Sequence, residues 1–456
     1  MVRRERKPKR NHAWSRREPA TPNGKNRIAT AGVVGGLFFP QSKRLGIDQG
    51  SYSPAVLERL IYAGVHHSSF ARASDALRRL ADLPIPTKQV ERLRQRIGAE
   101  RCVERDAAVA AYQALPLTAR KSAPAGVVEP DLAVVEADGG RLQVLDRDAA
   151  EAVPTSEAAA SAGHWREDKI GLLATMTSTV SEVDPCPTIP ESFVDPLRIV
   201  KLAQEIKGSM GVGAAAAREE ATPEPAGPAA TYTAPKLQQR SVSATLQDVY
   251  AFGPILAQAA WTRGFFAAKR RAFVADGSSA NWGVWERHFS NFTPIVDFIH
   301  ALSYVFAAAM AGRSFALGWA AYTEWIQALW AGQVERVVAA LAQRQVDLGA
   351  PTADEPETSP RNRVAEALTY LQNQKERMRY GAFRQQGLPI TSSHIESTIK
   401  QINQRVKGTE KFWSSAGAEA ILQLRADALS ETAPLDGFWK RRQAAATGQR
   451  RYQAAA

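Results

Sequence analysis

Three carboxylates occupy positions from which acidic side chains could share metal ions. They are Asp138 in VVEADGG, Asp276 in AFVADGSS and Glu396 in PITSSHIESTIKQ. The two aspartates end apolar runs, and the glutamate lies at the start of a helical pattern. Acidic ligands from separate parts of a chain are typical of sites for hard divalent cations. We therefore expect the three acids to meet in the folded core.

Each acid also has a purely structural explanation. The Asp-Gly pairs that begin at Asp138 and Asp276 are common turn dipeptides. Ser393 and Glu396 have the spacing of a capping box, in which the glutamate bonds back to the start of its helix. The case for catalysis therefore depends on how the surrounding elements are ordered.

The apolar pattern beyond residue 130 predicts an alternation of strands and helices. We expect strands at 134–137, 142–145 and 170–176, helices at 197–206 and 246–270, strands at 271–275 and 294–298, and closing helices at 393–407 and 416–429. The Asp-Gly-Gly turn would join the first two strands. Between the last strand and the closing helices, residues 301–385 have the pattern of an all-helical insertion.

This element order is that of a ribonuclease-H-like (RNase H-like) fold. The predicted class is therefore α/β, with a mixed five-stranded sheet, flanking helices, the helical insertion and an N-terminal helical region. In that order Asp138 would end the first strand, Asp276 the fourth, and Glu396 would open the closing helix. All three acids would then converge on one edge of the sheet.

Several stretches of the chain resemble those of DDE-type insertion-sequence transposases. The resemblance is strongest in VADGSSANW, IVDFIHALSYV and GLPITSSHIESTIKQINQRVKGTEKFWSSAGAEAIL. Weaker similarity extends to FFPQSKRLGID, SYSPAVLERLIYAG, VVEADGG and WREDKIGLLATM, so it covers most of the chain. The low-complexity segment 208–235 is a departure that the family pattern does not require.

The resemblance implies phosphodiester chemistry with two Mg²⁺ ions, for which Mn²⁺ can substitute. Asp138 would bridge both ions, and Asp276 and Glu396 would each hold one. Water would first free a 3′ hydroxyl at the end of a mobile element, and that hydroxyl would then attack target DNA. The implied partners are double-stranded DNA, as terminal inverted repeats and target, and further copies of the chain in a homo-oligomer on DNA.

Two further residues could support the metal ligands. Asp297 ends an apolar strand, and His300 follows three residues later. We expect Asp297 either to orient the site or to cap the helix that follows it.

The closing helix also predicts a DNA contact. One stripe at helical spacing is apolar and should be buried, namely Ile395, Ile399, Ile402 and Val406. The adjacent stripe carries Glu396, Lys400, Asn403 and Lys407, and Arg405 and Lys411 would extend it. These side chains would contact phosphates without reading sequence.

The N-terminal region has the pattern of a helix-turn-helix. Two helical segments, 69–81 and 86–98, are joined by a short connection. Val90, Leu93 and Ile97 would face the first of these helices, and the DNA-facing residues would be Thr87, Lys88, Gln89 and Arg92. A helical hairpin with a solvated basic face explains the same pattern equally well.

The predicted domains follow from these segments. They are a basic arm (1–30), the N-terminal DNA-binding region (31–105), a linker (106–130), a first part of the core (131–300, with the low-complexity loop 208–235), the helical insertion (301–385), a second part of the core (386–432) and a basic tail (433–456). A chain of 456 residues is long enough for two or three domains.

Composition favours a nucleic-acid partner. The net charge is +12 and the pI is about 9.7, as expected of a protein that neutralises phosphates. No apolar run reaches the eighteen or so residues of a membrane span. The two cysteines support neither a disulfide framework nor a thiolate zinc site, so we expect a cytoplasmic, nucleoid-associated protein.

Two other functions remain open from the sequence. The chain could be a non-catalytic or domesticated DNA-binding protein whose acids serve as turns and caps. It could also be an RNase H-like nuclease that cleaves DNA without strand transfer.

Overall fold

The computed structural model describes residues 52–145, 165–207, 232–408 and 410–446, with residues 29–30, 37–38, 44–45 and 47. The predicted basic arm, the low-complexity loop up to residue 231 and the last ten residues of the predicted basic tail lie largely or wholly outside this range. The chain divides into two compact units. The first takes its residues from Met1–Asp106, Arg141–Glu167 and Gln401–Ala456, and the second from Ala107–Gly140 and Asp168–Lys400.

A mixed sheet of six strands is the main β structure. Its strand order is β5-β4-β3-β6-β7, and β8 pairs separately with β3. The strands are β3 (Leu132–Val144), β4 (Trp165–Thr177), β5 (Lys236–Thr245), β6 (Arg270–Ala275), β7 (Thr293–Val296) and β8 (Phe412–Trp413). The predicted α/β class with a mixed sheet is confirmed, although the sheet has six strands rather than five.

The parallel part of the sheet forms the centre of the core. β3 pairs in parallel with β6, and β6 with β7, whereas β4 and β5 are antiparallel. The residues of β3 from Leu132 to Ala137 are all buried, as are residues 272–275 of β6. Strands covered on both faces read as continuous apolar runs, which is why these segments were recognisable in the sequence.

The predicted turn at Asp138 is wrong. Residues 132–144 form one extended strand, β3, so Asp138 lies within a strand rather than at its end. The pairing with β6 stops at Ala137, while β3 continues to Val144, where it meets β8. Tertiary strand pairing therefore overrides the local turn preference of Asp-Gly-Gly.

Two other elements differ from the prediction. β5 was not predicted, because its sequence KLQQRSVSAT lacks an apolar alternation; its first six residues are exposed or partly exposed, and its last four are buried. The predicted helix at 246–270 is shorter, since α9 covers only Val249–Thr262. The remaining elements agree closely with prediction: α7 (Pro196–Lys207), β6, β7, α16 (Ser393–Val406) and α17 (Ser415–Leu429).

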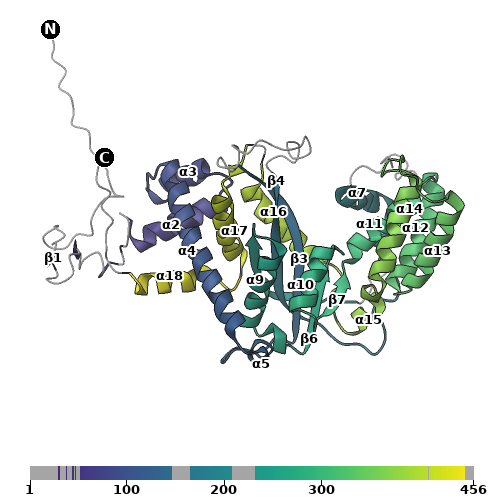
Figure 1. Cartoon of the computed structure of the whole chain (residues 1–456), viewed down its shortest axis with the longest axis horizontal. Helices are drawn as coiled ribbons and strands as arrows, with labels where there is room; N and C mark the ends of the chain where they lie inside the picture. The colour runs from purple at the N-terminus through teal and green to yellow at the C-terminus, as the bar shows by residue number, and fades with distance from the viewer. Residues whose placement is uncertain are drawn as a thin grey trace, which may run out of the picture. The chain divides into compact units, whose positions relative to one another are not determined.

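The residues predicted as a helical insertion are helical. Figure 1 shows these helices grouped together in the second unit. They are α11 (Phe298–Met310), α12 (Phe315–Trp330), α13 (Val334–Leu348), α14 (Pro360–Gln374) and α15 (Tyr380–Gln385), and α10 (Ser279–His288) precedes them. None of the described helices combines the length and apolar character needed to cross a bilayer.

The first unit is mainly helical. It contains α2 (Pro54–His66), α3 (Phe70–Ala81), most of α4 (Thr87–Ala114), the end of α16, α17 and α18 (Pro434–Ala444). Val90, Leu93 and Ile97, which were expected to face the first hairpin helix, are buried. The segment 106–130, predicted as a linker, begins inside α4 and includes the short helix α5 (Leu117–Arg120).

Gly98, the predicted end of the second hairpin helix, lies within α4. A Cβ at this position would lie 2.5 Å from the carbonyl oxygen of Ala420 and 2.7 Å from its Cβ. The glycine therefore allows α4 to approach the backbone of α17. The same interface contains the buried ion pair of Arg101 with Asp427, at 2.9 Å.

Gly98→Ala should destabilise the protein by roughly 1–3 kcal/mol, because overpacking against backbone exceeds the gain in helix propensity. The matched control is Gly283→Ala in α10, where an added Cβ meets nothing within 4 Å. That change should stabilise by about 0.5–1 kcal/mol. Urea unfolding of both variants measures this, and equal effects would contradict the close approach of α4 and α17.

Candidate metal centre

Three aspartates follow aligned positions on three neighbouring parallel strands. Ala137 of β3 is paired with Ala275 of β6, and Ala275 is paired with Val296 of β7. Asp138, Asp276 and Asp297 are the next residues in each strand direction. Because the register fixes these positions side by side, the three carboxylates gather at one edge of the second unit's sheet.

Asp276 is held in place by neighbours on both sides. Its Oδ1 accepts hydrogen bonds from Ser278 N and Asn281 Nδ2, each at 3.0 Å. Asn281 also donates to the carbonyl of Ala137 at 3.1 Å, which joins the end of the β3–β6 pairing to this carboxylate. The Asp-Gly turn predicted here is present, and Gly277 has a φ of +103° that disfavours other residues.

Asp138 is partly buried and is electrostatically coupled to the other acids. Burial raises its pKa to about 6, and the charges of Asp276 and Glu396 act in the same direction, against a hydrogen bond from Gly139 N. Burial is the main cause of this shift, and the nearby charge of His300 opposes it.

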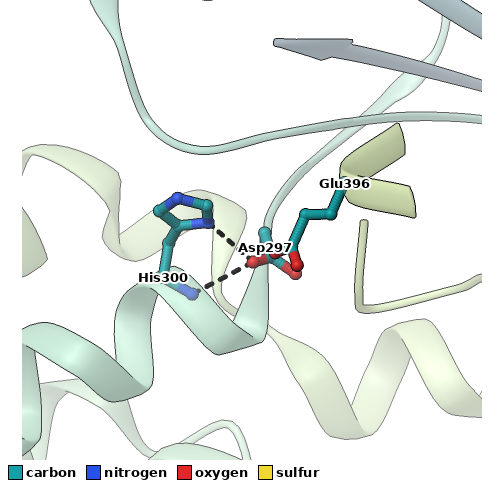
Figure 2. Close-up of side chains that lie close together, drawn as sticks. All are labelled: Asp297, His300 and Glu396. Carbon is teal, nitrogen blue, oxygen red and sulfur yellow. Dashed lines mark hydrogen bonds and ion pairs between the residues drawn. The ribbon is translucent and has the colours of Figure 1, made fainter. Parts of the chain in front are cut away.

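Asp297 anchors both the following helix and the loop before α16. Its Oδ2 accepts from His300 N at 3.0 Å and from His300 Nδ1 at 2.8 Å, and its Oδ1 accepts from Ser392 N at 2.9 Å. Figure 2 shows His300 and Glu396 next to this buried carboxylate. Asp297 therefore caps α11 and also orients His300 and the backbone at Ser392. Both kinds of role were expected for it from the sequence.

His300 is the positive partner of Asp297. Burial disfavours its protonation, but the hydrogen bond and charge of Asp297, helped by Asp276 and Asp138, raise its pKa to about 9. A protonated imidazole has no lone pair for a metal ion. One potential ligand atom each from Asp297, His300 and Glu396 lies within 4.8 Å of the others, so this trio could also hold a metal ion if His300 gave up its proton.

Glu396 projects from the first turn of α16 and is partly exposed. Burial is the main cause that raises the pKa of Glu396, and the charge of Asp297 adds to it. The charges of His300 and Lys400 lower this pKa. Within the described part of the chain no hydrogen bond returns from its carboxylate to the helix backbone, so the capping-box geometry is absent.

Glu136 takes that capping role, and the sequence analysis missed it. Its Oε2 accepts from Ile395 N at 2.8 Å, and its Oε1 is buried without a hydrogen-bond partner among the described residues. Burial raises its pKa to about 8, with Ile395 N opposing and the charges of Asp297 and Glu396 adding. The sequence feature that could have indicated Glu136 is a charged residue inside an apolar run. Glu136 lies two positions before Asp138 and therefore on the same face of the strand.

The residues present suit divalent cations. Asp138, Asp276 and Glu396 would supply oxygen ligands of the kind that Mg²⁺ and Mn²⁺ prefer, although the group of described residues whose ligand atoms all lie within 4.8 Å of one another is Asp297, His300 and Glu396. Asp297 adds negative charge next to Glu396, while Glu136, whose pKa is raised to about 8, is mostly protonated at neutral pH. A bound cation would favour the ionised forms of Asp138 and Glu396, whose pKa values are raised mainly by burial.

The predicted DNA-contacting residues are divided between the units. Lys400, one turn after Glu396, is exposed in the second unit. In the first unit Thr87, Lys88, Arg92 and Lys407 are exposed, and Gln89, Asn403 and Lys411 are partly buried. Arg405 does not extend the exposed face, because it is 2% exposed and its Nε donates to Gly64 O at 2.9 Å.

The metal-free protein should lose stability as the pH rises from 4 to 8. Between its ordinary value of 3.8 and about 6, folded Asp138 keeps a proton that the unfolded chain has released, and Glu136 does so between 4.5 and about 8. The folded state binds more protons there, so the free energy of unfolding falls with rising pH, by several kcal/mol in total. His300 acts in the same direction between 6.5 and about 9.

Urea unfolding at pH 5 and pH 8, with and without Mg²⁺, measures this effect. Mg²⁺ should stabilise the protein at pH 8 and have little effect at pH 5, where Asp138 is protonated. The control is the double variant Asp138→Asn, Glu136→Gln, which should show a smaller pH dependence. Equal stabilisation by Mg²⁺ at both pH values would count against a metal bound by these acids.

Comparison with known proteins does not identify the chain. No protein-family model matches it, and a search of curated proteins finds no match. Its function must therefore be inferred from the geometry of this cluster and from the motifs that carry it.

Proposed function

We propose that this protein is a metal-dependent polynucleotidyl transferase of the DDE transposase type, built on an RNase H-like core. The observation that carries the proposal is the alignment of Asp138 and Asp276 on paired parallel strands, with Glu396 electrostatically coupled to Asp138. The strand order is compatible with the fold, since β3, β4 and β5 are consecutive neighbours and β6 and β7 continue beyond β3.

The three acids have the roles that the resemblance implies. Asp138 would bridge two Mg²⁺ ions, with Asp276 and Glu396 each holding one. When bound, the ions activate the attacking oxygen and stabilise the leaving 3′ oxygen. Asn281 fixes the direction of Asp276 and, through Ala137, its separation from β3.

Asp297, His300 and Glu136 act as positioning residues. Asp297 and Glu136 bind the amides of Ser392 and Ile395, and these two bonds set the start of α16 from which Glu396 projects. Protonated His300 partly offsets the negative charge of Asp297, Asp276 and Asp138.

The geometry disfavours the non-catalytic alternative. If the acids were only turns and caps, Asp138 would lie in a turn and Glu396 would bond to its helix backbone; Asp138 lies in a strand instead. Asp138 and Asp276 each accept a local backbone hydrogen bond, from Gly139 N and Ser278 N, but Asp138 does so within a strand. A nuclease without strand transfer has the same site and is separated from a transposase by its products.

Asp138→Asn, Asp276→Asn and Glu396→Gln should each lower Mg²⁺-dependent cleavage by more than about 100-fold, because each removes a metal ligand. The substrate is duplex DNA from the two flanks of the coding region, where element ends would lie. DNA binding should be nearly unchanged. The matched control is Asp248→Asn, which alters an N-cap of α9 in the same unit.

Cleavage at the wild-type rate by any one of the three variants would remove that residue from the proposed site. Products distinguish the two enzymatic functions, since a transposase joins the freed 3′ end to a second DNA and a nuclease leaves it free. Cleavage absent in the wild-type protein with both Mg²⁺ and Mn²⁺ would favour the DNA-binding alternative.

Lys400→Ala should weaken DNA binding on all sequences and reduce the slope of log affinity against log salt by about 1, because it removes one phosphate contact. Lys269→Ala is the control, an exposed lysine that precedes β6 at the end opposite Asp276. Salt titrations of both variants measure the slopes. Equal slopes would show that Lys400 does not contact DNA.

A further inference from the structure

The first unit contains a pocket lined by positive charge. Its volume is about 260 Å³, below the range of most drug-sized sites. The walls include Phe70 at the start of α3, Arg94 from α4, Arg405 from α16, and Lys411 and Trp413 from the segment before α17. We call it the arginine pocket.

Arg94 and Arg405 are buried cations that form no ion pair within the described residues, although the charge of Glu91 acts favourably on Arg94. Each is 2% exposed. Arg94 Nη1 donates to Gly417 O and Arg405 Nε donates to Gly64 O, both at 2.9 Å. Arg94 Nε and Arg405 Nη2 are buried with no hydrogen-bond partner among the described residues, and within that range neither guanidinium forms an ion pair.

Three of the other buried arginines in the described part of the chain are paired with acids, whereas Arg425 forms no ion pair there. Arg101 binds Asp427, Arg105 binds Glu419, and Arg384 binds Asp184. Burial of a charge costs several kcal/mol unless an opposite charge and hydrogen bonds offset it. Among the described residues, Arg94 and Arg405 share this lack of an ion pair with Arg425, but Arg94 and Arg405 both line one pocket.

The local contacts do not offset that cost. Both guanidinium groups lie over the same two rings, at 5.1 and 5.3 Å from Phe70 and Trp413 for Arg94, and at 4.4 and 5.3 Å for Arg405. A cation–π contact contributes up to about 2 kcal/mol. Burial and the charge of Arg405 lower the pKa of Arg94 to about 9, and burial and the charge of Arg425 lower that of Arg405 to about 10.

Further positive potential comes from two helix N-termini and a lysine. Ser69, the N-cap of α3, and Ser414, the N-cap of α17, both line the pocket, and helix N-termini attract anions. Lys411 Nζ donates to the carbonyls of Gln404 and Arg405 at 3.2 Å. Two carboxylates also line it: Glu91, bound by Lys88 at 3.0 Å, and the exposed Glu410.

We propose that the arginine pocket binds a phosphate group through the free donors of Arg94 and Arg405. A phosphate has enough oxygens and charge to engage two guanidinium forks, whereas a carboxylate is matched by one. The group could belong to a DNA backbone or be free phosphate, and both present the same chemistry. This site lies in the first unit and does not depend on the proposed metal centre.

Calorimetric titration of the full chain with inorganic phosphate tests the proposal. The wild-type protein should bind phosphate saturably, and its melting temperature should rise with phosphate concentration. Arg94→Met and Arg405→Met should each weaken binding by at least about 10-fold, because each removes a charged hydrogen bond. Both should fold, since an apolar residue of similar size in place of a buried unpaired charge is neutral or stabilising.

The controls separate the pocket from overall charge. Arg441→Met removes an exposed arginine of the same unit and should leave phosphate affinity unchanged. Arg405→Lys keeps the charge but loses the fork, so it should also weaken binding. A short single-stranded oligonucleotide that competes with phosphate would identify nucleic acid as the source, and no competition would indicate free phosphate.

Several results would overturn the proposal. They are the absence of saturable phosphate binding by the wild-type protein, equal affinity for acetate and phosphate, and unchanged phosphate affinity in both Arg94→Met and Arg405→Met. If the methionine variants fail to fold, the wild-type titration and Arg405→Lys decide the question.

Discussion

The in-register parallel pairing of β3, β6 and β7 is the constraint on which the candidate site depends. Backbone hydrogen bonds align Ala137, Ala275 and Val296, so the aspartates that follow them cannot move apart without breaking the sheet. Burial, and to a smaller extent the charges of the neighbouring acids, raise the pKa of Asp138, so ionising this carboxylate in the folded protein costs stability. This arrangement lowers the stability of the folded protein, and bound cations would offset that loss.

Much of this site could be predicted from local sequence. The motifs around Asp276 and Glu396 lie where an apolar strand ends and a helix begins, and β6 and α16 form there. Asp138 was selected for the wrong reason, because its Asp-Gly-Gly segment has turn chemistry but is held extended by neighbouring strands. Glu136 was missed because strand patterns give no measure of how deeply one charged residue is buried.

In the part of the chain that the structure describes, each unit contains side chains of one charge sign that are not matched by opposite charge, negative in the second unit and positive in the first. In the second unit, His300 and Lys400 are the positive groups whose charges lower the pKa values of the clustered acids. In the first unit, Arg94 and Arg405 are buried and form no ion pair within the described residues. Sequence reasoning placed Arg405 on an exposed face, because helical spacing does not reveal that α16 packs against the residues around Gly64. Divalent cations and phosphate groups would satisfy the two charge imbalances, and a DNA-processing enzyme handles both.

The most direct test of the account is a crystal structure of the protein soaked with Mn²⁺, with the ions located by anomalous scattering. The account predicts two ions about 4 Å apart, with Asp138 bound to both and Asp276 and Glu396 bound to one each. A single ion held by Asp297, His300 and Glu396, or no ion near Asp138, would contradict it.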